Sequence, residues 1–238
     1  MNENHIYLSK IDLTLSQDIY DGLLQIISKE NRERCLRFRH KEDSLRTLYG
    51  ELIVRYALCR EFAVRNEEIE FIKSDDGKPY VKGVPVYFNV SHAGDFVVCA
   101  FSEHEVGVDI ERVRDVDLKL ARRYFCECEC EDLFAQDADR RIDYFFSLWT
   151  LKESYMKWLG RGLSVPLDSF FFKISDDGIS VTDVNRATVP FFKQFFVEGY
   201  KLSVCSTVDD FPDEMEEIIW DFCRRTELGV AYEENCNN

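Results

Sequence analysis

The chain has 238 residues, of which 45% are hydrophobic and 14% aromatic. This composition predicts a folded protein with a packed core rather than a disordered one, and the length suits one sizeable domain or two small ones. The formal net charge of −15 excludes general nucleic-acid binding and docking on an anionic membrane, because both require clustered positive charge.

The start of the chain and its cysteines predict a cytoplasmic protein. Residues 1–5 are polar and acidic, and no apolar run approaches the roughly 20 residues of a membrane span, so we expect neither a secretory signal nor a transmembrane segment. The 9 cysteines are odd in number and scattered, which predicts reduced thiols. Cys126, Cys128 and Cys130 invite a zinc interpretation, but the second pair of a usual zinc site is missing.

Hydrophobic periodicity predicts helices followed by antiparallel strands in the first half of the chain. In order, we expect a strand at 6–13, a helix capped by Ser16 and ending near 27, a basic stretch at 32–39, an amphipathic helix at 42–62, a turn at 75–79, and strands at 86–90 and 96–101 joined by residues 91–95.

The second half repeats this mixture. We expect a strand at 106–111, a helical region at 118–136, a helix at 143–159, an exit loop at 161–166, and strands at 170–174, 191–197 and 200–205. The strands that follow Gly94 and Gly199 share a weak pattern of glycine, apolar residues, valine and cysteine. This pattern predicts two similar lobes, which we divide into residues 1–104 and 105–238.

Three carboxylates and a lysine form the most informative constellation. The two-residue period of the strand at 106–111 places Asp109 and Glu111 on one face, and a later helix carries Glu153 with Lys157 one turn further on. Together they would suit a hard divalent cation that holds phosphate oxygens. The alternative is a solvated strand face and an ordinary surface pair; the apolar residues around Glu153 favour a largely buried helix instead.

Ser91 and His92 stand at the end of a predicted strand beside Gly94, where they could meet a phosphate; the alternative is a hairpin turn with a surface histidine. A nucleophile–base pair is a poor alternative, because neighbours on a strand point to opposite faces. Lys78, in the turn before Pro79, is a third candidate for phosphate binding.

Taken together, these segments resemble the 4′-phosphopantetheinyl transferases of the type that activates surfactin synthetase. The matching stretches occur in the family's order and cover most of residues 29–170. They are RFRHKEDSLRTLYG (37–50), GKPYV (77–81), FNVSHAGDFVVCAF (88–101), VGVDIE (106–111) and FSLWTLKESYMKWLGRGLSVPLDSF (146–170).

The resemblance implies a ligand set for each part of the site. Asp109, Glu111 and Glu153 would bind Mg²⁺, with Mn²⁺ as an alternative. The implied contacts to coenzyme A, the cosubstrate, are Arg46 and Thr47 near its adenosine and 3′-phosphate, Lys78, Pro79, Ser91 and His92 at its phosphates, and Lys152 and Lys157 beside its diphosphate.

The implied reaction moves phosphopantetheine from coenzyme A to a serine hydroxyl of an acyl or peptidyl carrier protein and releases adenosine 3′,5′-bisphosphate. Glu153, Lys157 and Glu129 are the implied catalytic residues. Glu153, Glu129 and a water held by the metal all remain candidates for the general base. The implied fold is α+β: two similar lobes related by a pseudo-twofold axis, with a cleft for coenzyme A between them. We expect a monomer, since one chain supplies both walls.

Two departures from the family pattern bear on binding. Asn31 stands where the family often has lysine, so Arg32 or Arg34 would have to replace it. Carrier proteins are usually acidic, and the net charge of −15 opposes their long-range attraction; docking should therefore rest on apolar contacts and a local basic patch, with residues 118–136 as the expected contact region. A binding module without catalysis and a Mg²⁺-dependent diphosphate hydrolase are the competing hypotheses.

Overall fold

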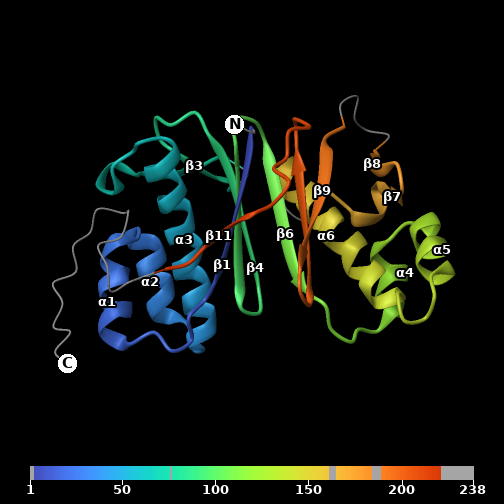
Figure 1. Ribbon diagram of the computed structural model, residues 1–238, viewed down its shortest axis with the longest axis horizontal. Helices are drawn as coiled ribbons and strands as arrows, with labels where there is room; N and C mark the ends of the chain where they lie inside the picture. Colours follow the sequence, from blue (N-terminus) through green and yellow to red (C-terminus); the bar gives the residue numbers. More distant parts are fainter. Residues whose placement is uncertain (1–2, 76, 161–164, 184–188, 221–238) are drawn as a thin grey trace.

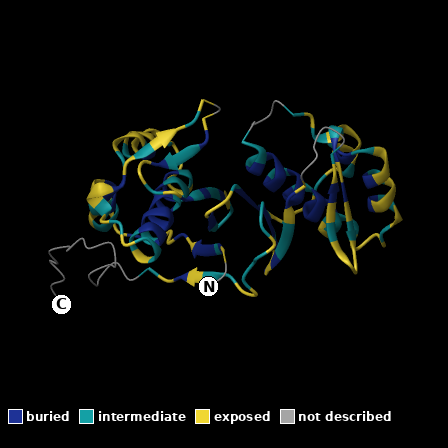
Figure 2. Ribbon diagram, turned by 90° about the horizontal axis from the view of Figure 1, so that it is seen from above, coloured by how far each residue is buried: buried dark blue, intermediate teal, exposed yellow. Residues whose placement is uncertain are grey.

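The computed structural model describes residues 3–75, 77–160, 165–183 and 189–220. The elements stack in four layers: helices, a sheet, a second sheet, and helices again (Figure 1). Buried residues run along the long helices and the strands between them, whereas exposed residues form the outer rim (Figure 2). None of the described helices combines the length and the apolar character that a bilayer span needs.

The N-terminal lobe packs helices on one face of a four-stranded sheet with the order β11-β1-β5-β4. Strands β1, β5 and β4 are antiparallel, and β11 joins β1 in parallel. A short hairpin, β2–β3, lies apart from this sheet. The elements are β1 (Asn4–Lys10), α1 (Gln17–Ile26), α2 (Lys29–Arg37), α3 (Lys41–Glu61), the 3₁₀ turn η1 (Asn66–Glu68), β2 (Phe71–Lys73), β3 (Pro79–Val81), β4 (Tyr87–Ala93), β5 (Phe96–Ser102) and β11 (Glu216–Ile218).

The C-terminal lobe repeats this plan around an antiparallel sheet with the order β6-β10-β9. Its hairpin is β7–β8. The elements are β6 (Val106–Arg112), the 3₁₀ turn η2 (Leu118–Leu120), α4 (Ala121–Tyr124), α5 (Glu127–Ala135), α6 (Arg141–Leu159), the 3₁₀ turn η4 (Leu167–Ser169), β7 (Phe171–Ser175), β8 (Gly178–Thr182), β9 (Phe191–Val197) and β10 (Tyr200–Ser206).

The two lobes use the same succession of elements. In each, a strand is followed by helices, a small hairpin and then a long hairpin, and the strand orders β1-β5-β4 and β6-β10-β9 correspond. The predicted α+β fold with two similar lobes is confirmed. β11 adds a segment from near the end of the chain to the first sheet, while the division after residue 104 stays a prediction.

Three apolar cores hold the layers together. One lies between the N-terminal helices and their sheet, and another surrounds α6. The third fills the space between the two sheets, with Ile6 and Val98 from one and Val108, Leu202 and Val204 from the other. Burial on this scale is the main favourable term in folding, so the sheet-to-sheet core joins the lobes into one body.

Local signals explain several element boundaries. Ser16 caps α1 as expected, since its hydroxyl accepts a hydrogen bond from the Ile19 N–H. Gly160 ends α6 in the left-handed region, with φ of 68°. At Gly107 a side chain would overlap the carbonyl oxygen of Ser154 and the amide nitrogen of Trp158, so glycine lets β6 and α6 pack closely.

The structure differs from the expected elements in several places. The strand expected at 6–13 ends at Lys10, and most of the basic stretch at 32–39 belongs to helix α2. The helical region at 118–136 is interrupted, because Phe125 and Cys126 are extended and Glu129 reaches back to the Cys126 N–H to start a new helix, α5. Strand β4 continues through Ser91, His92 and Ala93, where we expected a connection, and turns only at Gly94, with φ of 52°. Residues 161–164 of the expected exit loop lie outside the described residues.

Candidate functional site

The site begins where the edge strands β4 and β6 lie side by side at the lobe boundary. The Val108 N–H donates to Asn89 Oδ1 at 3.1 Å, and the Ile110 N–H donates to Ser91 Oγ at 3.4 Å. Side chains of one strand thus satisfy backbone donors of the other, which an edge strand would otherwise leave unpaired.

Asp109 lies between these two donors and is 5% exposed. Its Oδ1 accepts hydrogen bonds from Ser91 Oγ at 2.9 Å and from Lys157 Nζ at 2.7 Å. Lys157 Nζ also donates to the Val108 carbonyl at 3.0 Å. The other oxygen, Asp109 Oδ2, is buried and has no hydrogen-bond partner. A buried carboxylate oxygen without a partner is costly, which makes it a natural ligand for a cation.

Glu111 and Glu153 share the electrostatic environment of Asp109. Burial and the charge of Asp109 raise the pKa of Glu153, and burial, Asp109 and Glu153 raise that of Glu111. Like charges that must share a partly buried site favour the protonated forms. Burial and mutual repulsion therefore couple the three predicted metal ligands, which we call the acidic trio (Asp109, Glu111 and Glu153), and Lys157 forms an ion pair with Asp109.

The donor set fits a hard divalent cation, although the oxygens do not yet form a closed cage. Within the described ranges, no group of three or more His, Cys, Asp or Glu side chains is arranged as a metal site, and Lys157 holds one oxygen of Asp109. The oxygen-only ligands and the unpartnered Asp109 Oδ2 match the preferences of Mg²⁺. Binding would require the carboxylates to close around the ion.

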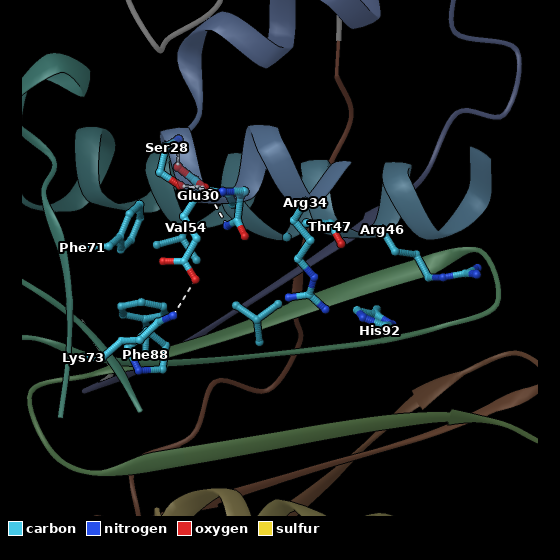
Figure 3. Close-up of a pocket in the computed structure, with 15 residues that line it drawn as sticks. Ser28, Glu30, Arg34, Arg46, Thr47, Val54, Phe71, Lys73, Phe88 and His92 are labelled. Atoms are coloured by element: carbon cyan, nitrogen blue, oxygen red, sulfur yellow. Dashed lines mark hydrogen bonds and ion pairs between the residues drawn. The ribbon is translucent and has the colours of Figure 1, made fainter. Parts of the chain in front are cut away.

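A cavity of about 310 Å³ opens in the N-terminal lobe between α2, α3, the β2–β3 hairpin and β4. Its basic side chains are Arg34, Arg46, Lys73 and His92, and Phe71 is one of its apolar walls (Figure 3). Two carboxylates also line it, Glu30, which pairs with Lys73, and Glu51. We call it the basic cavity. Its lining comes from the N-terminal lobe alone, so the expected cleft between the lobes is met only where His92 on β4 approaches β6.

His92 marks the end of the basic cavity nearest the acidic trio. Ser91 and His92 are neighbours on β4 and point to opposite faces, as expected: Ser91 contacts Asp109, and His92 lines the cavity. Partial burial and the positive charges of Arg46 and Lys157 lower the pKa of His92. The imidazole is therefore neutral near pH 7, and an anion bound beside it would favour its protonation.

Arg46 is held in place at the mouth of this cavity. Its guanidinium donates to the Gly94 carbonyl at 2.8 Å and to Asp43 Oδ1 at 2.7 Å. The hydrogen bond from Arg46 lowers the pKa of Asp43. Thr47, the next residue on α3, also lines the cavity, so both predicted adenosine contacts lie where a ligand could reach them.

The structure separates the two arginines that could replace the family lysine at position 31. Asn31 itself donates to Glu51 Oε2 at 2.7 Å, and Glu51 is also paired with Arg55 at 2.7 Å. Arg32 donates to Gln25 Oε1 at 3.1 Å, whereas Arg34 reaches into the cavity toward His92 (Figure 3). Arg34 is thus the cation in position to act.

Lys78 lies near the site but is engaged elsewhere. Pro79 lines the basic cavity, while Lys78 Nζ forms an ion pair with Glu105 and donates to the Val106 carbonyl at 3.4 Å. This buried lysine bridges the β2–β3 hairpin to the start of β6. It does not line the cavity.

Glu129 and Lys152 are not brought to the site. Both side chains are 0% exposed and form an ion pair at 2.8 Å inside the C-terminal lobe. Lys152 also donates to the Phe170 carbonyl at 2.9 Å, and Glu129 accepts from the Phe172 N–H at 2.8 Å. The expectations that Glu129 is catalytic and that Lys152 contacts coenzyme A therefore need correction. The two side chains form hydrogen bonds and an ion pair with each other and with the backbone near β7.

The three cysteines near α5 do not converge. Cys126 is the N-cap of α5, and its Sγ lies 3.1 Å from the Asp168 carbonyl oxygen and 3.3 Å from that of Phe170. Cys128 is exposed, and Cys130 is only partly buried. All the cysteines that the structure describes are free thiols.

Sequence reasoning missed most of the cavity walls. Lys73 and Phe71 belong to a strand of three residues, too short to stand out by periodicity. Ser28 could have been found, because serine is a preferred N-cap residue, and its hydroxyl accepts from the Asn31 N–H at 3.3 Å.

Comparisons with known proteins agree on one family. Residues 14–104 match a model described as 4′-phosphopantetheinyl transferase, N-terminal, and residues 105–205 match the 4′-phosphopantetheinyl transferase superfamily. The 4′-phosphopantetheinyl transferase Sfp of Bacillus subtilis is 39% identical over 91% of this chain and 98% of its own length. The transferase gsp of Aneurinibacillus migulanus is 35% identical over 83% of each chain.

Among solved structures, the holo-[acyl-carrier-protein] synthase of Thermotoga maritima matches 43% of this chain and 61% of its own with 22% identity and a TM-score of 0.38, values too low to bear on the site. The matches to the two transferases have higher identity and cover more of the chain, since they span both lobes. The chain belongs to the 4′-phosphopantetheinyl transferase family.

Proposed function

We propose that this transferase moves 4′-phosphopantetheine from coenzyme A to a serine hydroxyl of an acyl or peptidyl carrier protein. One observation supports the assignment of roles: a basic cavity in one lobe ends, at His92, beside an acidic trio on the other. A ligand with a phosphorylated nucleoside at one end and a diphosphate nearby matches this order of charges.

The basic cavity is proposed to hold the adenosine part of coenzyme A and its phosphates. Arg34, Arg46 and His92 supply positive charge or hydrogen bonds to phosphate, and Thr47 adds a hydroxyl. Phe71 and Phe88 provide apolar surface. Lys78 and Ser91, expected as direct phosphate contacts, would have to leave Glu105 and Asp109 first.

The acidic trio is proposed to hold Mg²⁺, with Mn²⁺ as an alternative. Bound there, the ion would supply positive charge that offsets the charge developing on the leaving phosphate. Lys157, at the edge of the trio and 28% exposed at its side chain, can donate to the same phosphate once it is released from Asp109 Oδ1. It then acts as a second electrostatic contact that does not depend on the ion.

Glu153 is the favoured candidate for the general base. Of the two carboxylates that the family resemblance left open, Glu129 is sealed in an ion pair, whereas Glu153 lies beside Asp109 with a raised pKa. A cation held by the trio would lower that pKa again, so the assignment rests on the place of Glu153 beside Asp109 and not on a raised basicity. Glu153 would take the proton of the acceptor serine as its oxygen attacks phosphorus.

A cytoplasmic monomer with a lobe boundary after residue 104 completes the proposal. The described cysteines are free thiols, which supports a reducing compartment. Both the basic cavity and the acidic trio come from one chain, which supports catalysis by a single subunit.

Mass spectrometry of an apo carrier domain tests the function directly. Purified protein, coenzyme A and Mg²⁺ should increase the carrier mass by one phosphopantetheine group, and replacing the acceptor serine by alanine should abolish the gain. Binding of coenzyme A without transfer to any of several carriers would identify a binding module instead. Cleavage of coenzyme A without a carrier would identify a hydrolase.

A further inference from the structure

Asn89 lies on β4 two residues before Ser91, hence on the same face of the strand. It does not line the basic cavity and is not one of the acids. Its Oδ1 accepts the Val108 N–H at 3.1 Å, one residue before Asp109. We infer that Asn89 is a positioning residue, which fixes β6 against β4 so that the acidic trio can bind its cation. This inference rests on the proposed function.

The backbones of β4 and β6 do not pair with each other. Throughout the described ranges, β4 and β6 belong to different sheets and share no ladder. Both are edge strands, whose backbone donors need other acceptors when they are buried. Asn89 and Ser91 meet this need with the same two-residue spacing as Val108 and Ile110. The register of the lobes at the site therefore depends on two side chains.

These contacts surround the residue before Asp109. The Val108 N–H donates to Asn89 Oδ1, and the Val108 carbonyl accepts from Lys157 Nζ at 3.0 Å. Ser91 touches the Asp109 carboxylate directly, so a change there would alter the ligand itself. Asn89 makes its hydrogen bond to the backbone of β6. A change at Asn89 thus alters placement without altering any proposed ligand.

Cation binding should depend on where these contacts place Asp109. The acidic trio must close around an ion, and Asp109 Oδ2 is buried without a hydrogen-bond partner. Groups that orient a metal ligand typically change affinity by about 10- to 100-fold when they are removed. Loss of the Asn89 acceptor should therefore weaken divalent-cation binding while the basic cavity, which lies on the other face of β4, keeps its affinity for nucleotide.

Asn4 provides a matched control. It is buried, and like Asn89 it joins the lobes through its side-chain amide: Nδ2 donates to the Asp210 carbonyl at 2.9 Å, and Oδ1 accepts from Ser206 Oγ at 2.8 Å. It contacts no member of the acidic trio. Asn4→Ala therefore removes three inter-lobe hydrogen bonds of a side-chain amide, to Val208, Asp210 and Ser206, without touching the strand segment that carries Asp109.

The experiment measures binding by the full-length protein rather than activity alone. Mn²⁺ affinity is measured by electron paramagnetic resonance, and affinity for adenosine 3′,5′-bisphosphate by calorimetry without metal, on wild type, Asn89→Ala, Asn89→Asp and Asn4→Ala. We expect Asn89→Ala to weaken Mn²⁺ binding about tenfold and nucleotide binding less than about twofold. Asn89→Asp keeps the acceptor oxygen but adds a negative charge beside the trio, so it should bind Mn²⁺ at least as tightly as wild type, whereas Asn4→Ala should stay near wild type.

The outcomes separate this inference from the proposed function. Wild-type Mn²⁺ binding that Asn89→Ala leaves unchanged would overturn the inference alone, as would an equal loss in Asn4→Ala. A wild type that neither binds Mn²⁺ nor modifies any carrier would overturn the proposed function, and the inference with it. If Asn89→Ala does not fold, Asn89→Leu, which fills the same space without an acceptor, replaces it.

Discussion

Asp109 combines one oxygen that accepts two hydrogen bonds with one that accepts none. Beside it, burial and the charge of Asp109 raise the pKa values of Glu111 and Glu153. A group whose pKa is raised in the folded state binds its proton more tightly than in the unfolded chain, so its ionised form costs stability at neutral pH. The site thus stores an electrostatic cost that a cation would relieve.

Replacing Glu153 by glutamine should therefore separate stability from activity. The substitution removes one of the mutually repelling charges with little change in volume, and we expect a gain in unfolding free energy on the order of 0.5–1 kcal/mol, measured by denaturant unfolding without Mg²⁺. Phosphopantetheine transfer should fall at least about a hundredfold. Glu103→Gln, a change at an exposed acid, is the control; near-native transfer by Glu153→Gln would exclude it as ligand or base.

Cation binding should strengthen as the pH rises. Mg²⁺ binds the ionised carboxylates, and the raised pKa values of Glu111 and Glu153 mean that protons compete with it over a range that extends above the usual one for glutamate. The increase in melting temperature caused by Mg²⁺ should thus be larger at pH 7.5 than at pH 5.5. A shift of equal size at both values would contradict this account of the trio.

At the scale of elements, the contact between α6 and β6 places Lys157 against Asp109. Gly107 makes the contact possible, since a β-carbon there would overlap backbone atoms of Ser154 and Trp158 on α6. Backbone atoms of a packed helix cannot move aside as a flexible side chain can. The distance between strand and helix, and hence the Lys157–Asp109 ion pair of 2.7 Å, depends on this glycine.

Gly107→Ala should destabilise the protein by about 3 kcal/mol or more, beyond the usual range of overpacking, because the clash involves backbone. Thermal unfolding measures the loss. Gly50→Ala is a suitable comparison. Gly50 lies within α3, where alanine favours the helix, and the added carbon would lie at an ordinary 3.5 Å from Val90 Cγ1 on β4. Equal stability of the two variants would mean that α6 can withdraw from β6 at little cost.

The sequence predicted the elements with long, regular patterns. Helix α3 and strand β6 lie within a residue or two of the expected bounds, and the spacing of Glu153 and Lys157 placed them correctly on one helix face. The prediction that Lys152 contacts coenzyme A did not allow for its place on the helix. Lys152 is one residue, or about 100°, around the helix from Glu153, so its side chain points into the core. Its partner Glu129 comes from a different helix. No local pattern reveals such a pairing.

The cavity was beyond prediction for a similar reason. Its walls come from α2, the middle of α3, the β2–β3 hairpin and β4, which are far apart in the sequence. Asn31 likewise pairs with Glu51, 20 residues further along. The identity of ligands could be inferred from motifs, but the space between elements depends on tertiary packing.

At the scale of the whole molecule, three stacked cores and the side-chain contacts between β4 and β6 make the lobes one body. The net charge of −15 surrounds this body with a negative field. Exposed basic side chains form a local patch on α4, where Arg122 stacks on Phe134 and Arg123 stacks on Tyr124. The long-range field and the local patch therefore act on an acidic partner in opposite directions.

Raising the ionic strength should therefore speed the encounter with an acidic apo carrier. Salt screens interactions beyond about 8 Å at 0.15 M, which removes the distant repulsion and leaves close contacts less affected. We expect kcat/KM for the carrier to rise about twofold between low salt and this concentration, while affinity for coenzyme A should fall. A kcat/KM that decreases with salt would show that the local basic patch governs association.

Strand β11 ties the order of synthesis to the order of folding. It pairs in parallel with β1, so the first strand of the chain is completed by one of its last described segments. A growing polypeptide emerges from the ribosome with its N-terminal part first, and the open edge of β1 must wait until the chain has been translated past Glu216. A product truncated before Glu216 would carry an uncovered strand edge, which is a template for aggregation.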